Sequence, residues 1–192
     1  FSASNPVGFD LSELAMRYSR RRGESRLVQA SATHIPFPAG IFDLITSLDV
    51  LNHLPEGGDV LALREFHRLL KGGGKVFVRL PAYQWLYASH DRHSLTLQRY
   101  TRSQLVSRLN AAGFTIIQVS YANFFLFPVL AAKRLLLEKV GILADSSDLR
   151  PVPSLLNRIL EWPLRIESRL LRYPHFRFPW GLSIVGLAEK RL

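Results

Sequence analysis

The sequence predicts an α/β fold of three layers around a mainly parallel sheet. Short runs rich in β-branched and aromatic residues alternate along the chain with longer runs of helical periodicity. That alternation is typical of strands connected by crossover helices. The length of the chain agrees with this fold class, because 192 residues of which 47% are hydrophobic can bury one sizeable core.

Cap, turn and periodicity signals divide the chain into elements. Ser12 is placed to cap a helix that Gly23 closes, and the run Thr101-Arg-Ser-Gln104 resembles a capping box. The expected strands are Val7–Asp10, Leu27–Ala30, Phe42–Ser47, Lys75–Leu80, Phe114–Tyr121 and Gly181–Ala188. The expected helices are about 12–22, 59–70, 101–113, 124–137 and 155–171.

These elements suggest a core with one large insertion. Residues 1–121 and 181–192 make up the expected core, and residues 122–180 are too long for an ordinary connection. The insertion holds an apolar helix candidate at 124–137, with Lys133 and Arg134 near its end. Such a helix can cap a substrate, pack on a partner subunit or make a peripheral contact with an anionic membrane. The sequence leaves these three roles open.

Composition excludes several classes of site. The chain has no cysteine, which removes disulfides, thiolate zinc sites and cysteine nucleophiles and fits a reducing cytoplasm. The formal charge of +10 makes a nucleic-acid partner worth considering. The basic residues are dispersed, however, and no RNA-recognition consensus is present, so a nucleic-acid substrate is not favoured. No secretory signal opens the sequence, and a cytoplasmic location is expected.

Asp10 is the most informative single residue. It follows a short strand, and an acid at the carboxyl end of the second strand of a Rossmann-like sheet can accept hydrogen bonds from both ribose hydroxyls of an adenosine cofactor. Taken alone, such an acid is more often a turn or helix-capping residue. Its context decides between these two readings.

The context is an ordered series of motifs. Gly8-Phe-Asp10-Leu-Ser12-Glu-Leu-Ala15 precedes Ala30-Ser-Ala-Thr-His-Ile-Pro-Phe-Pro38, and then come Phe42-Asp-Leu-Ile45, Leu51-Asn-His-Leu54 and Arg68-Leu-Leu-Lys-Gly-Gly-Gly74. Over about residues 7–121 this order resembles the class I S-adenosylmethionine-dependent methyltransferase family, of the type 11-like kind. The family succession is G-x-D-x-S-x-x-x-L/A, D-A-x-x-L-P-F, F-D-x-V, V-L-x-H-L and R-x-L-K-P-G-G.

The resemblance implies a Rossmann-like methyltransferase fold with an antiparallel last strand, and S-adenosyl-L-methionine as the cofactor. Asp10 would hold the ribose hydroxyls, with Leu11 against the adenine. Ser31 stands where the family usually has an acid for the adenine amino group, and the Ala32 backbone N–H would serve the adenine ring. Ser31 is thus a departure from the pattern at the adenine end.

The resemblance also places residues beyond the third and fourth predicted strands. Ser47, Leu48 and Asp49 would line the cleft near the methionine part of the cofactor. Asp49 is equally well explained as a loop carboxylate that caps a nearby backbone.

After the next strand, His90 and Asp91 are the candidate catalytic residues, because they could accept a proton from a methylated oxygen or nitrogen. His90 and His93 lack a third ligand at suitable spacing, so no metal site is predicted.

The expected function is methyl transfer to a small or lipid-like acceptor. The family's glycine-rich cofactor turn and first strand have no counterpart in these 192 residues. We therefore expect a fragment whose isolated chain binds the cofactor weakly or not at all. A non-catalytic remnant or partner-binding module is the alternative. A nicotinamide-dependent oxidoreductase ranks lower, because no tyrosine has a lysine four residues later.

Overall fold

A computed structural model describes residues 5–133, 154–173 and 175–192. The strands are β1 (Gly8–Asp10), β2 (Leu27–Gln29), β3 (Phe42–Leu48), β4 (Leu70–Pro81), β5 (Thr115–Ala122) and β6 (Ser183–Glu189). The α-helices are α1 (Glu13–Arg21), α2 (Gly58–Leu69), α3 (Ser89–His93), α4 (Arg102–Ala111), α5 (Phe127–Lys133) and α6 (Ser154–Leu170), and two 3-10 turns are η1 (Leu51–His53) and η2 (Gln84–Leu86). Each expected strand and helix is confirmed, with bounds that differ by a few residues.

Four strands form the main sheet, in the order β3-β4-β6-β5. β3 and β4 are parallel, and β6 is antiparallel to both of its neighbours, β4 and β5. β5 therefore runs in the same direction as β3 and β4, so these three strands end at one edge of the sheet. The antiparallel last strand confirms the expected α/β fold class.

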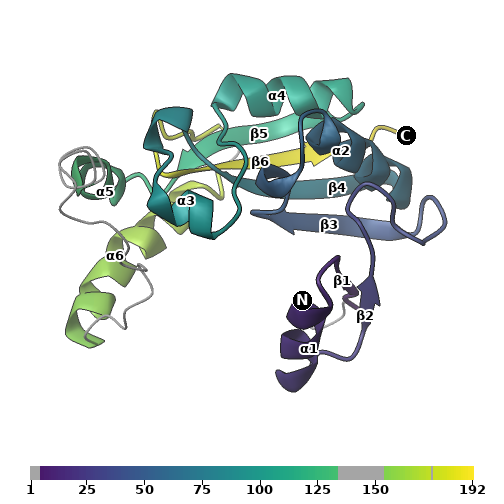
Figure 1. Cartoon of the computed structure of the whole chain (residues 1–192). Helices are drawn as coiled ribbons and strands as arrows, with labels where there is room; N and C mark the ends of the chain where they lie inside the picture. The colour runs from purple at the N-terminus through teal and green to yellow at the C-terminus, as the bar shows by residue number, and fades with distance from the viewer. Residues whose placement is uncertain (1–4, 134–153, 174) are drawn as a thin grey trace.

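β1 and β2 form a separate parallel pair instead of extending the main sheet. Figure 1 shows this pair, together with α1, on the side of the main sheet where β3 is the edge strand. Among the described residues no strand bridges β1 and β3, and a ring contact between Phe9 and Phe66, with centroids 6.3 Å apart, connects β1 to α2. This two-part arrangement differs from the single sheet that the sequence predicts.

The core lies on the face of the main sheet that α2 and α4 cover. Val76, Val78 and Leu80 of β4 are fully buried there, together with Phe66 of α2. A Cβ built on Gly186 of β6 would lie 3.1 Å from the Leu105 side chain, so α4 packs closely on this strand. Burial of each such side chain contributes roughly 1.5–3 kcal/mol. The opposite face is more open at β3, where Leu44 and Leu48 are 41% and 49% exposed.

Local signals explain where the helices begin and end. The Ser12 hydroxyl accepts the Ala15 N–H at the start of α1, and Thr101 and Gln104 form the expected capping box of α4. The glycines after α2 behave differently from the prediction. They do not separate helix from strand, because β4 begins at Leu70 and includes them, with Gly73 at φ +77°. The Gly73 N–H donates to the Lys190 carbonyl, which explains this extension.

The predicted insertion contributes α5 and α6, which lie beyond one end of the main sheet (Figure 1). The apolar segment 124–137 is partly packed, since Phe124 stacks on Phe178 and Trp180 with centroids 4.9 and 5.2 Å apart. Residues 134–137 of that predicted helix lie outside the described residues. Within the described part of the chain, no helix combines the length and apolar character that a membrane span requires.

Candidate functional site

Backbone strain gathers at the edge where β3, β4 and β5 end. Each strand is followed by a non-glycine residue with positive φ: Asp49 at 53°, Tyr83 at 57° and Asn123 at 60°. This region of backbone space is costly for residues with a Cβ, and such outliers cluster at functional sites. The carboxyl ends of parallel strands are also where α/β folds bind ligands. Two independent features thus point to the same edge.

Specific contacts keep these three residues in place. Asp49 forms an ion pair with Arg79 of the neighbouring strand. The Tyr83 N–H donates to the Tyr100 carbonyl, and its ring stacks on Tyr121 at 5.0 Å. The Asn123 N–H donates to the Glu167 carboxylate. The edge is therefore held in its strained shape by contacts from β4, β5 and α6.

The carboxyl end of β1 presents Asp10 and Leu11 to solvent. Asp10 is exposed, and its Oδ1 accepts the Ser12 N–H at 2.8 Å, which joins the strand end to the cap of α1. Leu11 is 68% exposed, which is high for a large apolar side chain. An exposed carboxylate beside an exposed apolar side chain fits a ribose and an adjoining planar base.

Ser31 and Ala32 follow β2, as predicted, in a tight turn. The Ser31 hydroxyl lies 2.9 Å from the Thr33 hydroxyl and accepts the Thr33 N–H at 3.3 Å. Ala32 is 8% exposed and belongs to the hydrophobic core. The Ser31 hydroxyl is thus already part of a local hydrogen-bonded turn.

The three candidate residues at the end of β3 differ in exposure. Ser47 is 3% exposed, and its hydroxyl has no hydrogen-bond partner within the described structure. Leu48 points to the opposite face, since successive side chains of a strand alternate, and it is exposed. Asp49 pairs with Arg79, which agrees better with a structural carboxylate than with one directed at a ligand. Of the three, Leu48 and Asp49 reach solvent, with Leu48 49% exposed and the paired Asp49 side chain 39% exposed.

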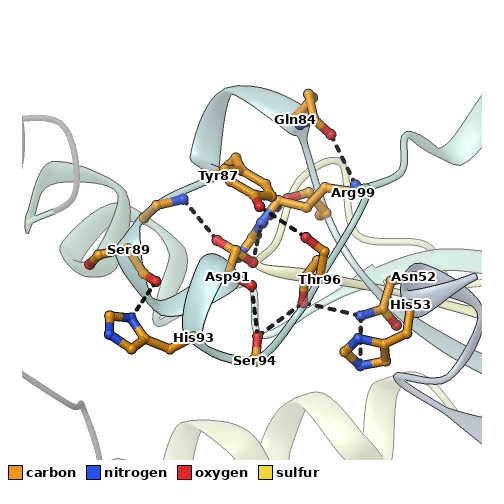
Figure 2. Close-up of polar contacts among 12 residues, drawn as sticks. Asn52, His53, Gln84, Tyr87, Ser89, Asp91, His93, Ser94, Thr96 and Arg99 are labelled. Atoms are coloured by element: carbon orange, nitrogen blue, oxygen red, sulfur yellow. Dashed lines mark hydrogen bonds and ion pairs between the residues drawn. The ribbon is translucent and has the colours of Figure 1, made fainter. Parts of the chain in front are cut away.

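Asp91 lies in a buried ion pair with Arg99. Arg99 donates from Nε to Oδ1 and from Nη2 to Oδ2, both at 3.0 Å, and Oδ2 also accepts the Ala88 N–H at 2.8 Å. The two side chains are 3% and 6% exposed. Figure 2 shows Arg99 reaching across to Asp91 beside Tyr87. The Asp91 carboxylate therefore positions the connection between β4 and α4. Of the two predicted catalytic residues, His90 is exposed on α3 and Asp91 is buried.

The same network reaches the turn that follows β3. Asn52 Nδ2 donates to the Thr96 hydroxyl at 3.3 Å, and His53 Nδ1 lies 3.0 Å from the Leu95 carbonyl (Figure 2). The Leu97 N–H donates to the Asn52 carbonyl at 2.8 Å. The loops beyond β3 and β4 therefore form one hydrogen-bonded unit, to which His53 contributes.

A second buried polar cluster lies behind these loops. The Tyr100 hydroxyl donates to Asp59 Oδ2 at 3.1 Å, and Arg108 Nε lies 3.0 Å from the same oxygen. Asp59 is fully buried, and burial, reinforced by the Asp59 charge, raises the pKa of the Tyr100 hydroxyl well above its usual range. Tyr100 therefore stays protonated and structural. The sequence alone does not pair Tyr100 with Asp59, because the two residues lie 41 positions apart in the chain.

Comparison with known proteins agrees with this architecture. Residues 2–78 match the family model described as a methyltransferase domain. The chain is 26% identical over 122 residues to YdaC, an uncharacterized methyltransferase of Bacillus subtilis, covering 60% of this chain and 61% of that protein. The chain therefore has the fold of class I methyltransferases, and its residues 2–78 resemble a methyltransferase domain.

Two further comparisons define how far the likeness extends. UbiE, a ubiquinone/menaquinone biosynthesis C-methyltransferase of Geobacter sp., is 34% identical over 89 residues, which cover 43% of this chain and 37% of UbiE. The solved structure of an S-adenosylmethionine-dependent methyltransferase of Thermotoga maritima, a possible histamine N-methyltransferase, has a TM-score of 0.61 at 16% identity, covering 96% and 72% of the two chains. The chain spans less than two thirds of the length of either curated relative.

The residues at the β1 end of this chain fit the adenosine part of S-adenosylmethionine. Asp10 offers a carboxylate for two hydroxyls, and Leu11 offers an apolar surface. Ser47 supplies an unpartnered buried hydroxyl near the end of β3. Ser31 fits less well, since its hydroxyl already serves the turn. Among the described residues no three metal-ligating side chains converge.

Proposed function

We propose that this protein transfers a methyl group from S-adenosylmethionine to a small or lipid-like acceptor. The observation that carries the proposal is the exposed Asp10 carboxylate at the carboxyl end of β1, next to the exposed Leu11 and within the segment that matches the methyltransferase model. S-adenosylmethionine supplies an electrophilic methyl group on a sulfonium. The protein must then bind it, align the acceptor and exclude water.

The β1 end and the edge where β3, β4 and β5 end have separate tasks in this proposal. Asp10 and Leu11 hold the ribose and adenine. The strained Asp49 and Tyr83 shape the floor where the acceptor approaches. The buried Asp91–Arg99 pair keeps the β4–α4 connection in position, so that His90 can accept a proton from the acceptor.

Aromatic side chains support an apolar or planar acceptor. Tyr83 and Trp85 lie with ring centroids 5.6 Å apart, and Phe127 of α5 lies 5.8 Å from Tyr83. Trp85 is 53% exposed at the end of β4, so it can contact a bound molecule. Large rigid aromatic surfaces of this kind suit ring-containing or lipid-like substrates.

Methyl transfer is tested with the protein that its gene encodes, methyl-labelled S-adenosylmethionine and fractionated cell extract. Label entering a small-molecule or lipid fraction supports the proposal. Exclusive labelling of RNA or protein would contradict the acceptor class, and binding of a nicotinamide dinucleotide in place of S-adenosylmethionine would contradict the activity.

His90→Gln separates chemistry from binding. As a general base, His90 contributes about 10²–10⁴-fold to kcat, and its replacement leaves KM nearly unchanged. His93→Gln is the matched control, because His93 is an exposed histidine of the same helix whose Nδ1 lies 2.8 Å from the Ser89 carbonyl. An equal fall in kcat for both variants would refute the role given to His90.

A further inference from the structure

α6 carries a stripe of exposed arginines around an exposed tryptophan. Arg158, Trp162, Arg165 and Arg169 follow a spacing of four, three and four residues, which places them on one face of a helix. Trp162 is 69% exposed and the Arg165 side chain is 74% exposed. Arg158 and Arg169 are exposed as well. We call these four residues the α6 stripe.

The opposite face of α6 anchors the helix to the fold. Glu167 lies on that face, about half a turn around the helix from Arg158, and it is 4% exposed. Its carboxylate accepts the N–H of Asn123 and, at 2.9 Å, the N–H of Phe124. These bonds fix the rotation of α6, because turning the helix would remove the carboxylate from both donors. The α6 stripe must therefore face away from the sheet.

The charge of this face is strongly positive. The negative charge of Glu161 is partly compensated by Arg165, 3.1 Å away. Glu167 is buried on the opposite face of the helix. Arg172 and Arg177, just after the helix, are also exposed. The face thus presents guanidinium groups and a large indole ring side by side along the helix.

We propose that the α6 stripe docks the protein on an anionic phospholipid surface. Indole rings prefer the headgroup level of a bilayer, and arginines nearby gain attraction from anionic headgroups. A helix that lies in the interface plane needs one face of this composition. The stripe holds one aromatic residue, whereas a single-strand nucleic-acid platform uses several aromatics for successive bases. This inference does not depend on methyl transfer.

Vesicle co-sedimentation tests the proposal. The protein is expected to bind vesicles of phosphatidylcholine mixed with phosphatidylglycerol, and to bind pure phosphatidylcholine far less. The triple variant Arg158→Gln/Arg165→Gln/Arg169→Gln should bind the mixed vesicles roughly a hundredfold more weakly, at about fivefold for each arginine. Added salt should weaken the wild-type binding.

α1 provides a matched control. Its Arg17, Arg20 and Arg21 are exposed on a helix that also has an exposed aromatic residue, Tyr18, and an ion pair of the same spacing, Arg17–Glu13. The triple variant Arg17→Gln/Arg20→Gln/Arg21→Gln removes the same charge, and it should keep most of the vesicle binding. Circular dichroism and thermal unfolding confirm that both triple variants are folded.

Trp162 reports the geometry directly. The chain has three tryptophans, so Trp85→Phe/Trp180→Phe leaves Trp162 as the single indole. Its emission should shift to shorter wavelength on mixed vesicles and be quenched by brominated lipid. Equal loss of binding in the α1 variant, no difference between the two vesicle types, an unshifted Trp162 emission, or binding to single-stranded RNA but not to vesicles would each overturn the proposal.

Discussion

The β1 end and the β4–α4 connection present polar groups in opposite ways. Asp10 is exposed, and within the described part of the chain its carboxylate accepts the N–H of Ser12. Asp91 is buried, and both of its oxygens accept hydrogen bonds. An exposed carboxylate can exchange water for ligand hydroxyls at low cost, whereas a buried and paired one is committed to structure. In the proposed site, the side chains that would bind the cofactor and the side chains that position the loops lie on separate segments.

The largest expected effect comes from breaking the buried pair. Arg99→Ala leaves the Asp91 charge buried without its partner, and should lower the free energy of unfolding by about 3–5 kcal/mol. Urea denaturation measures it. Lys71→Ala is the control, because Lys71 pairs with Asp43 at the surface, and the expected loss there is below about 1 kcal/mol. Similar losses in the two variants would contradict the contrast between buried and exposed charges.

The cluster behind the loops should show a smaller effect. Tyr100→Phe removes the hydroxyl that donates to the fully buried Asp59, and should cost about 1–3 kcal/mol of stability. The matched change Tyr18→Phe affects a tyrosine that is 55% exposed, and should alter stability by less than about 0.5 kcal/mol. If Tyr100→Phe is equally neutral in urea denaturation, the hydrogen bond to Asp59 has no structural role.

The contribution of Glu167, which anchors α6, to the free energy of unfolding should depend on pH. Burial raises the pKa of Glu167, while the N–H donors of Asn123 and Phe124 oppose that shift. Because the pKa is higher in the folded than in the unfolded state, the folded chain binds more protons between the two values. Stability from this group therefore falls as pH rises from the usual glutamate value, about 4.5, towards the raised one.

Glu167→Gln should remove that pH dependence. The difference in unfolding free energy between wild type and Glu167→Gln is expected to fall with rising pH, by at most about 1.4 kcal/mol per pH unit. Thermal or urea unfolding at a series of pH values provides the curve. Glu161→Gln, at the exposed ion pair with Arg165, should give no comparable slope. A difference that rises with pH would show that the folded-state pKa is lowered instead.

The smallest effect is expected at the surface pair of Asp49 and Arg79. Asp49→Asn keeps a residue type that tolerates positive φ and removes only the exposed ion pair. The expected loss of stability is below about 1 kcal/mol, and it should shrink further at high salt. A loss as large as that of Arg99→Ala would place Asp49 among the buried, positioning charges.

Local signals explain what could be predicted from the sequence. Some features depend only on residues close together in the chain, so the sequence predicts them. They are the cap at Ser12, the capping box at Thr101 and the β-branched strand β5. The family motifs likewise identified Asp10 at the end of a strand. Element order followed from the local signals, and the antiparallel β6 from the resemblance to the methyltransferase family.

Long-range contacts explain what could not be predicted. The pairing of Asp49 with Arg79, and of Glu167 with the N–H of Phe124, joins residues far apart in sequence. Asp91 lay in the right loop, but only the fold shows that Arg99 covers it. The separation of β1 and β2 from the main sheet also depends on tertiary packing, since both are ordinary short strands by sequence.

We propose that the β1 end of this chain holds S-adenosylmethionine through Asp10. Isothermal titration calorimetry of the protein encoded by its gene, with S-adenosylmethionine, tests it most directly. We predict binding that Asp10→Ala weakens by about tenfold or more, as expected for hydrogen bonds to a charged group worth about 1.5–3 kcal/mol. Asp43→Ala, at the exposed pair with Lys71, should leave the affinity unchanged. Binding that is equally strong in wild type and Asp10→Ala would contradict the account.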